Sequence, residues 1–242
     1  MCIRDRTTNG LGLEKRAGAL AAAGLDRINI SLDTIDRERY AALTRRDRLD
    51  HVLQAIAAAD AAGLHPIKIN AVVMPGVNEE DIVPLADYAV HHGAQLRFIE
   101  QMPLGPREQW RREDMVTAED ILARLRTHFS MTPAREPRGS APAALWEVSA
   151  PDGTHGTLGI IASVTHPFCG DCDRTRLTTD GAIRNCLFGN SETPLRDLLR
   201  SGASDAEIME AWAGEMWTKK PGHGIDDEGF LQPDRPMSAI GG

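Results

Sequence analysis

Apolar and polar residues follow two different rhythms along the first hundred residues. Alternation at every second position predicts strands, and apolar residues three or four positions apart predict helices. Strands are predicted over 27–33, 66–73 and 95–102. Helices are predicted over 11–23, 36–44, 51–62 and 79–91. Strands that are joined by amphipathic helices indicate right-handed crossovers and a parallel sheet.

The predicted strands carry polar residues on one face, where a filled β/α barrel carries Val, Ile and Leu. These polar positions are Asn29, Ser31 and Asp33 on the first strand, Lys68 and Asn70 on the second, and Arg97 and Gln101 on the third. We favour a curved, incompletely closed β/α barrel of the TIM type, whose interior holds a polar ligand. The solvent-facing side of an ordinary sheet is the plainer alternative, and the pattern leaves it open.

The second half of the chain has a different organisation. Segments rich in proline, glycine and charge at 103–116 and 133–142 interrupt the helix–strand alternation. Short β-like segments follow at 144–148, 157–163 and 177–184, with a helix predicted at 205–218. We therefore assign a partial barrel to 7–115 and a C-terminal α+β domain to 116–242, and we expect residues 1–6 to be non-native.

The predicted helix at 205–218 has an apolar face that contains Ile208, Trp212 and Met216. Such a face normally packs against a core. We therefore expect Trp212 and the nearby Trp217 to be core residues rather than a stacking platform.

The bulk composition excludes some classes of protein. The hydrophobic fraction of 42% and the charged fraction of 26% are ordinary for a soluble globular chain. The net charge of −8 argues against broad nucleic-acid binding, and no apolar run approaches the roughly 18 residues of a membrane helix. We expect neither nucleic acid nor membrane as a partner, and a cytoplasmic location.

Cysteine spacing provides the strongest chemical signal. Three of the four cysteines form a C-x2-C-x13-C run, namely Cys169, Cys172 and Cys186. His166 could complete a closed Cys3His zinc site. Otherwise, three thiolates would leave one iron of a [4Fe–4S] cluster open to a ligand, since four cysteines are the usual set. Spacing alone leaves zinc and iron–sulfur open, but Arg174 and Arg176 favour an open metal position beside an anionic substrate.

Taken together, these motifs resemble those of the GTP 3',8-cyclase family of radical S-adenosylmethionine enzymes. The matching segments are Thr7–Gly10 (TTNG), Ile28–Asp33 (INISLD), Ile67–Asn70 (IKIN), Leu96–Glu100 (LRFIE) with Met102, the run from Phe168 to Phe188, and the terminal Gly241-Gly242. The cysteine run with its R-x-R is highly specific, whereas TTNG and ISLD are weak when taken alone.

The resemblance implies an incomplete β/α barrel followed by a domain that holds a [4Fe–4S] cluster. It implies cyclisation of GTP to (8S)-3',8-cyclo-7,8-dihydroguanosine 5'-triphosphate, the first step of molybdenum cofactor biosynthesis. S-adenosylmethionine and a second [4Fe–4S] cluster would serve the full-length parent. Cyclic pyranopterin monophosphate synthase would be the downstream partner, and a homodimer is compatible with the sequence. A non-catalytic zinc module and a related radical enzyme acting on peptides remain alternatives.

The resemblance also assigns roles to individual positions. Cys169, Cys172 and Cys186 would ligate the C-terminal cluster; Thr7, Lys68, Arg174 and Arg176 would contact GTP; Ser31 and Met102 would contact S-adenosylmethionine; and Gly241 and Gly242 would reach the active site. On the residues alone, Lys68 is equally well a solvated strand residue and Thr7 a turn former.

The sequence departs from the family pattern slightly at Asp173, where Asn is common, and severely in one other respect. The family carries a C-x3-C-x2-C motif and a Gly-Gly-Glu-Pro segment that do not occur in this sequence, and Cys2 by itself cannot hold the cluster that cleaves S-adenosylmethionine. We therefore expect an N-terminally truncated chain that cannot initiate the radical reaction alone, and we assign no catalytic residue.

Overall fold

The computed structural model describes residues 3–104, 110–228, 230–233, 235 and 237–240. It divides into two compact units that the chain visits alternately. The first unit comprises 1–101, 114–138 and 142–165, and the second comprises 102–113, 139–141 and 166–242. Gly241 and Gly242 lie outside the described residues.

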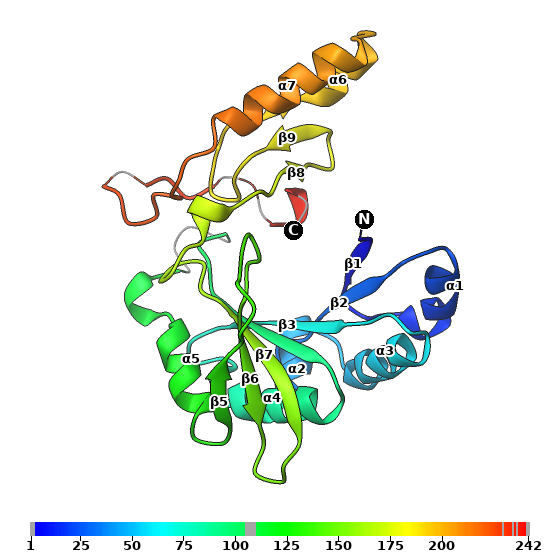
Figure 1. Cartoon of the computed structure of the whole chain (residues 1–242), viewed down its shortest axis with the longest axis vertical. Helices are drawn as coiled ribbons and strands as arrows, with labels where there is room; N and C mark the ends of the chain where they lie inside the picture. Colours follow the sequence, from blue (N-terminus) through cyan, green and yellow to red (C-terminus); the bar gives the residue numbers. More distant parts are fainter. Residues whose placement is uncertain (1–2, 105–109, 229, 234, 236, 241–242) are drawn as a thin grey trace. The chain divides into compact units, whose positions relative to one another are not determined.

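The first unit is built on a seven-stranded sheet with the order β1-β2-β3-β4-β7-β6-β5 (Figure 1). The strands are β1 Asp5–Thr8, β2 Arg27–Ser31, β3 Ile67–Val73, β4 Gln95–Glu100, β5 Ser130–Pro133, β6 Ala144–Ser149 and β7 His155–Ile161. Neighbours from β1 through β4 to β7 pair in parallel, and β7, β6 and β5 pair antiparallel. The predicted parallel pairing of β2, β3 and β4 is confirmed, the sheet as a whole is mixed, and the first unit is an α/β structure.

Helices connect these strands in the predicted order. They are η1 Leu13–Lys15, α1 Ala17–Ala22, α2 Arg37–Thr44, α3 Leu49–Ala61, η2 Glu79–Asp81, α4 Ile82–His91 and α5 Ala118–Leu125, with a further 3-10 turn, η3, at Arg112–Asp114. The prediction of one continuous helix over 11–23 is wrong. Gly10 and Gly12 both have left-handed backbone, with φ of 82° and 75°, so the chain is still turning where the helix was expected to begin.

The core of the first unit lies between one face of the sheet and its helices. Residues of β3 and β4 alternate strictly between buried and half-buried positions. The buried row includes Ile69 and Phe98, each at most 1% exposed. It packs against the apolar faces of α3 and α4, which contribute Val52 and Leu85 to the same core. Side chains of the opposite row are therefore on the face that these helices do not cover.

Strands β5 to β7 extend the sheet of the first unit rather than forming a sheet of their own. They follow the domain boundary that the sequence predicts at 115/116. The assignment of two domains that meet at 115/116 stays a prediction. In the structure, strands that come after residue 116 belong to the same sheet as β1 to β4. The pairing of β7 with β4 joins two strands that are separated in sequence by the segment containing α5, β5 and β6.

One buried carboxylate binds both ends of the segment that contains α5, β5, β6 and β7. Glu100, at the end of β4, is 0% exposed. One of its oxygens accepts from the Ala118 backbone N–H at 2.8 Å and the Thr165 hydroxyl at 2.5 Å. The other accepts from the N–H groups of Val164 at 2.8 Å and Thr165 at 2.9 Å. Four donors compensate the cost of removing this charge from water.

The second unit contains a small antiparallel sheet and two helices. The strands are β8 Arg176–Leu177, β9 Ala182–Arg184 and β10 Thr193–Pro194, in the order β10-β9-β8. The helices are α6 Leu195–Arg200 and α7 Asp205–Trp217, with 3-10 turns η4 Cys169–Asp171 and η5 Met237–Ala239. The predicted turn at Asp180-Gly181 joins β8 to β9, and Gly181 has a φ of 83° there.

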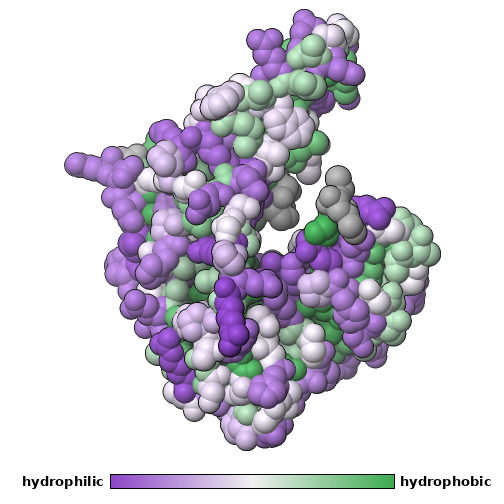
Figure 2. All heavy atoms as spheres, viewed as in Figure 1, coloured by the Kyte–Doolittle hydropathy of each residue, from purple (hydrophilic) through white to green (hydrophobic). Residues whose placement is uncertain are grey.

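The predicted core role of two tryptophans in this unit is wrong. Trp212 is 39% exposed and Trp217 is 87% exposed. Green, hydrophobic atoms are visible among purple ones on the surface over α6 and α7 (Figure 2). Among the described residues of α7, only Glu215 is buried. The small sheet is too short to cover the apolar face of a helix of 13 residues.

A search for membrane-spanning segments gives a negative result. Among the helices that the structure describes, none is long and apolar enough to cross a membrane.

Candidate functional site

Polar side chains gather on the face of the first unit's sheet that α3 and α4 do not cover. In one row across the strands, Thr7, Asn29, Lys68 and Gln95 lie in register. In the next row, Ser31 lies beside Asn70, and Asn70 lies beside Arg97. The strand pairing therefore brings together Thr7, Ser31 and Lys68, three of the residues predicted from the sequence.

Arg97 is oriented by two neutral side chains on the neighbouring strands. Its Nε donates to Asn70 Oδ1 at 2.9 Å, and its Nη2 donates to Asn29 Oδ1 at 2.5 Å. A Cβ at Gly159 of β7 would lie 3.0 Å from Arg97 Cγ, so the absence of a side chain there leaves room for the arginine stem. Both of these acceptors are neutral amide oxygens.

Among the described residues, two arginines and one aspartate are the charged groups that act on Lys68. Burial lowers the pKa of Lys68, and the nearby positive charges of Arg97 and Arg27 lower it further. Arg27 itself is paired with Asp5 through two bonds of 2.6 Å. Like charges that crowd one another in this way are relieved when an anion arrives. The face is therefore chemically suited to bind a phosphate or carboxylate group.

The second unit collects the three thiols of the C-x2-C-x13-C run. Cys169, Cys172 and Cys186 are free and half-buried. Burial raises the pKa of the Cys169 thiol, and the other two sulfurs raise it further because they are close enough to repel its charge. The backbone N–H of His223 and the ammonium of Lys219 act in the opposite direction. The three thiols thus share one electrostatic environment, as a common bound group requires.

Two arginines accompany the thiols. Arg174 Nη1 lies 3.9 Å from Cys172 Sγ, and its guanidinium carbon is 4.7 Å from the ring centroid of Phe168. Burial lowers the pKa of Arg176, Arg174 lowers it further, and the sulfurs of Cys186 and Cys172 raise it. The sequence placed both arginines beside the thiols, and the structure agrees.

The donor set of the loop suits an iron–sulfur cluster, because thiolates on a [4Fe–4S] cluster each bind a different iron. A closed zinc site needs a fourth ligand at about 2.0 to 2.3 Å, and His166, the fourth ligand of the zinc alternative, is exposed. Within the described ranges, no group of three or more His, Cys, Asp or Glu residues that could hold a metal ion was found.

The predicted site residues divide between the two units. Thr7, Ser31 and Lys68 belong to the first, while Met102, Arg174, Arg176 and the three cysteines belong to the second. Gly241 and Gly242 lie outside the described residues. Sequence reasoning noted Asn29, Asn70 and Arg97 only as polar strand positions. Their alternation with apolar residues was the signal that the sequence offered for them. Lys219 and Gly159 gave no such signal, because the contacts of Lys219 with the thiol loop and of Gly159 with Arg97 join segments far apart in sequence.

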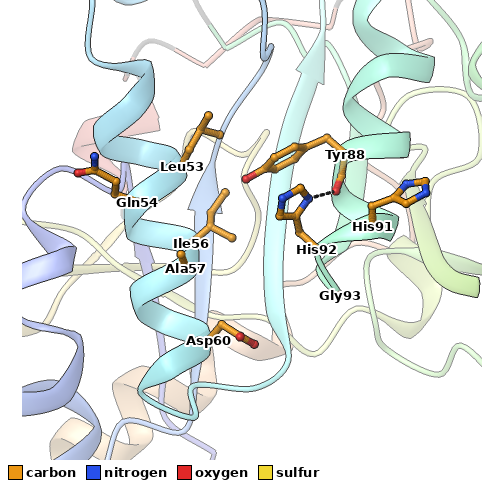
Figure 3. A pocket seen from close by; sticks show the side chains of 9 residues that line it. All are labelled: Leu53, Gln54, Ile56, Ala57, Asp60, Tyr88, His91, His92 and Gly93. Atoms are coloured by element: carbon orange, nitrogen blue, oxygen red, sulfur yellow. Dashed lines mark hydrogen bonds between the residues drawn. The ribbon is translucent and has the colours of Figure 1, made fainter. Parts of the chain in front are cut away.

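A shallow pocket of about 640 Å³ lies elsewhere in the first unit, between α3 and α4 (Figure 3). Tyr88 and His92 stack there with ring centroids 4.0 Å apart, and His92 Nδ1 donates to the Tyr88 carbonyl at 2.8 Å. None of the site residues predicted from the sequence lines this pocket.

Comparison with curated proteins finds extensive similarity. The chain is 76% identical over 239 residues to a GTP 3',8-cyclase of Corynebacterium glutamicum, which covers 98% of this chain and 63% of the relative. It is 60% identical over 237 residues to GTP 3',8-cyclase 2 of Mycobacterium tuberculosis, which covers 98% and 66%. The chain therefore spans less than two thirds of the length of these relatives.

Among solved structures, Escherichia coli coproporphyrinogen III oxidase (HemN), described as a radical SAM enzyme, matches 65% of this chain and 50% of its own with 10% identity and a TM-score of 0.39. That likeness is too weak to add to the assignment. The radical SAM superfamily model matches residues 7–89. The Molybdenum Cofactor Synthesis C model matches residues 94–225, more than half of the chain. The chain therefore belongs to the Molybdenum Cofactor Synthesis C family.

Proposed function

We propose that the protein containing this chain converts GTP to (8S)-3',8-cyclo-7,8-dihydroguanosine 5'-triphosphate at the start of molybdenum cofactor biosynthesis. The observation that carries the proposal is the loop of three neighbouring thiols with Arg174 against Cys172. The family models support it, because a radical SAM segment precedes a molybdenum cofactor segment in one chain. The names of the similar curated proteins agree.

In this proposal Cys169, Cys172 and Cys186 hold a [4Fe–4S] cluster. When bound, such a cluster with three protein thiolates supplies one iron that is open to the purine. Arg174 and Arg176 contact GTP beside that iron. Their fixed, planar donors suit the oxygens of a nucleotide, and their charges attract it.

The polar face of the first unit has a separate task. Lys68 would neutralise part of the triphosphate, with Thr7 as a further contact. Ser31 and Met102 would contact S-adenosylmethionine, which would supply the radical chemistry together with a second [4Fe–4S] cluster in the full-length parent. Holding substrate and cofactor in a fixed arrangement is the part that these side chains contribute to the rate.

Several further roles follow from the same assignment. The terminal Gly241-Gly242 would reach the substrate, cyclic pyranopterin monophosphate synthase would consume the product, and the working enzyme would be cytoplasmic. The first unit would be an incomplete β/α barrel of the radical SAM type whose first strands are missing, followed by a C-terminal domain with the iron–sulfur cluster.

Iron loading and nucleotide binding test the proposal directly. Anaerobic reconstitution of the 242-residue chain with iron and sulfide should yield about four of each per chain. In the loaded chain, Arg174→Ala and Arg176→Ala should each weaken GTP binding about tenfold to a hundredfold, since each removes a charge-assisted hydrogen bond of about 1.5–3 kcal/mol. Iron content should stay unchanged in both variants.

Calorimetry with GTP measures these affinities. Arg200→Ala, at the exposed end of α6, removes the same charge from the same unit and should leave binding intact. A single tightly bound zinc with no iron, or equal GTP affinity in all variants, would contradict the proposal.

A further inference from the structure

Lys219, two residues beyond the end of α7, makes an unusual pair of contacts for a lysine. Its Nζ donates to the carbonyl oxygen of Arg174 at 2.6 Å and to that of Asn185 at 2.7 Å. The side chain is half-buried. Fixing a long lysine costs about 1.5–2 kcal/mol of rotamer entropy, so two short bonds to one ammonium indicate a built contact rather than a passing one.

Both carbonyls lie next to proposed cluster ligands. Arg174 follows Cys172 by two residues, and Asn185 immediately precedes Cys186. These ligands belong to segments that come from opposite sides of the β8–β9 hairpin. A single ammonium group therefore links the two segments and limits how far Cys172 and Cys186 can move apart.

The helix that carries Lys219 is itself fastened to the second of these segments. Asn185 Nδ2 donates to the Glu215 carbonyl at 2.9 Å and to Thr218 Oγ1 at 2.7 Å. Thr193 Oγ1 in turn donates to Glu215 Oε2 at 2.7 Å. The C-terminal end of α7 is thus bound to the segment that carries Cys186. Lys219 extends from this end of the helix to the segment that carries Cys172.

Charge gives Lys219 a second effect. Its ammonium is held against the carbonyls of Arg174 and Asn185, close in sequence to two of the proposed ligands. A cluster on three thiolates gains negative charge when it accepts an electron, and net charge and hydrogen bonding nearby set its reduction potential. A fixed cation at this place should therefore make reduction easier.

We propose that Lys219 is a positioning residue for the iron–sulfur cluster, which it serves by holding the Cys172 and Cys186 segments together and by raising the reduction potential with its charge. The inference rests on the cluster in the proposed function. The two effects of Lys219 can be measured separately. The link between the two segments is measured in the metal-free chain, and the effect of charge on the reduction potential is measured in the iron-loaded chain.

The first measurement is hydrogen exchange in the metal-free chain. Lys219→Met should speed amide exchange several-fold in peptides that cover 172–186, because both carbonyls lose their shared donor. Lys220→Met is the matched control: it removes the neighbouring, exposed lysine and should leave exchange at the wild-type rate. Equal exchange rates in the two variants would overturn the proposal that Lys219 holds the Cys172 and Cys186 segments together. This result is independent of which metal the chain binds.

The second measurement is spectroelectrochemical titration of the reconstituted chain. Lys219→Met should shift the cluster potential downward and speed loss of iron to a chelator, whereas Lys219→Arg, which keeps the charge, should restore the potential. If Lys219→Met does not fold, Lys219→Gln keeps a neutral donor and should lower the potential while preserving slow exchange. Potentials equal to wild type in both neutral variants would overturn the charge effect. Zinc without iron in the wild-type chain would instead refute the proposed function.

Discussion

At the scale of single residues, the first unit uses neutral amides where ion pairs would be expected. Arg97 donates to the neutral amide oxygens of Asn29 and Asn70, which orient the guanidinium on this face of the sheet. A carboxylate at either position would make stronger bonds and a weaker anion site. Polar residues on a strand face were visible in the sequence, but their function as a pair of acceptors for one arginine was not.

Asn70→Asp tests this interpretation. The new carboxylate would still accept from Arg97 Nε but would cancel one charge of the cluster around Lys68. We expect binding of inorganic tripolyphosphate to weaken about tenfold, equivalent to about 1.4 kcal/mol, with thermal stability retained. Calorimetry at low salt measures the affinity. Gln54→Glu, which adds the same charge at an exposed position of α3, should leave binding unchanged, and equal losses in both variants would show that the effect is not local.

Glu100 provides a residue-scale prediction about stability. In Glu100→Gln one oxygen is replaced by an amide nitrogen that faces two donors, so two charge-assisted bonds are lost. We expect a loss of about 3 kcal/mol in the free energy of unfolding, measured by urea denaturation. Glu147→Gln, at an exposed position of β6, is the control. A difference below about 0.5 kcal/mol between the two variants would mean that the buried carboxylate has little effect on stability.

At the scale of elements, periodicity predicted the strands and longer helices well, because each buries one face. It failed for short elements such as β10 and α6, where too few residues repeat. It also misassigned Trp212, since a pattern shows which residues share a helix face and not what covers that face. The order β4-β7-β6-β5 depends on pairing between distant segments, which local pattern does not contain.

The end of α4 provides a pH-dependent contact between elements. His91 Nε2 lies 2.8 Å from Asp152 in the β6–β7 turn, and its Nδ1 lies 2.8 Å from the Asp87 carbonyl. The hydrogen bond that His91 donates to Asp152 raises the pKa of His91 above its ordinary value, and the Asp87 carbonyl adds to this. The pKa of Asp152 is held well below its usual range by the same histidine.

The sign of the effect follows from the raised pKa. The contact stabilises the fold fully below the ordinary histidine pKa of about 6.5 and loses that contribution as pH rises through the higher folded-state value. The difference in melting temperature between wild type and His91→Gln should therefore shrink from pH 6 to pH 8. Differential scanning calorimetry measures it, with His51→Gln as control. A constant difference across this range would contradict the contact.

At the scale of the whole molecule, two chemically distinct sets of groups occupy the two units: a cationic polar face on a parallel sheet, and a thiol loop with two arginines. Three of the four cysteines are assigned to the thiol loop, and the fourth, Cys2, is isolated in the sequence. The family resemblance assigned roles to residues of both sets from sequence, and these roles stay predictions.

A whole-molecule prediction concerns the radical reaction. We expect the purified 242-residue chain, reconstituted and reduced, to form no 5'-deoxyadenosine from S-adenosylmethionine, because it lacks the C-x3-C-x2-C motif. Chromatographic detection of the nucleoside decides the matter. The Corynebacterium glutamicum relative of which the chain covers 63% provides the positive control, and turnover by the chain alone would refute the prediction.

Gly159 has a consequence for anyone who wishes to make this protein more heat-resistant. Replacing strand glycines by alanine is a common route to stability, because glycine weakens a strand and has more freedom to lose on folding, by about 0.5–1 kcal/mol. Here the added methyl would meet the Arg97 stem at 3.0 Å and the Ala143 methyl at 3.2 Å. A stabilisation campaign that ranked positions by residue type alone would select this site, where the Arg97 stem and Ala143 would have to shift by a few tenths of an ångström. Gly159 is therefore a position to exclude from such designs.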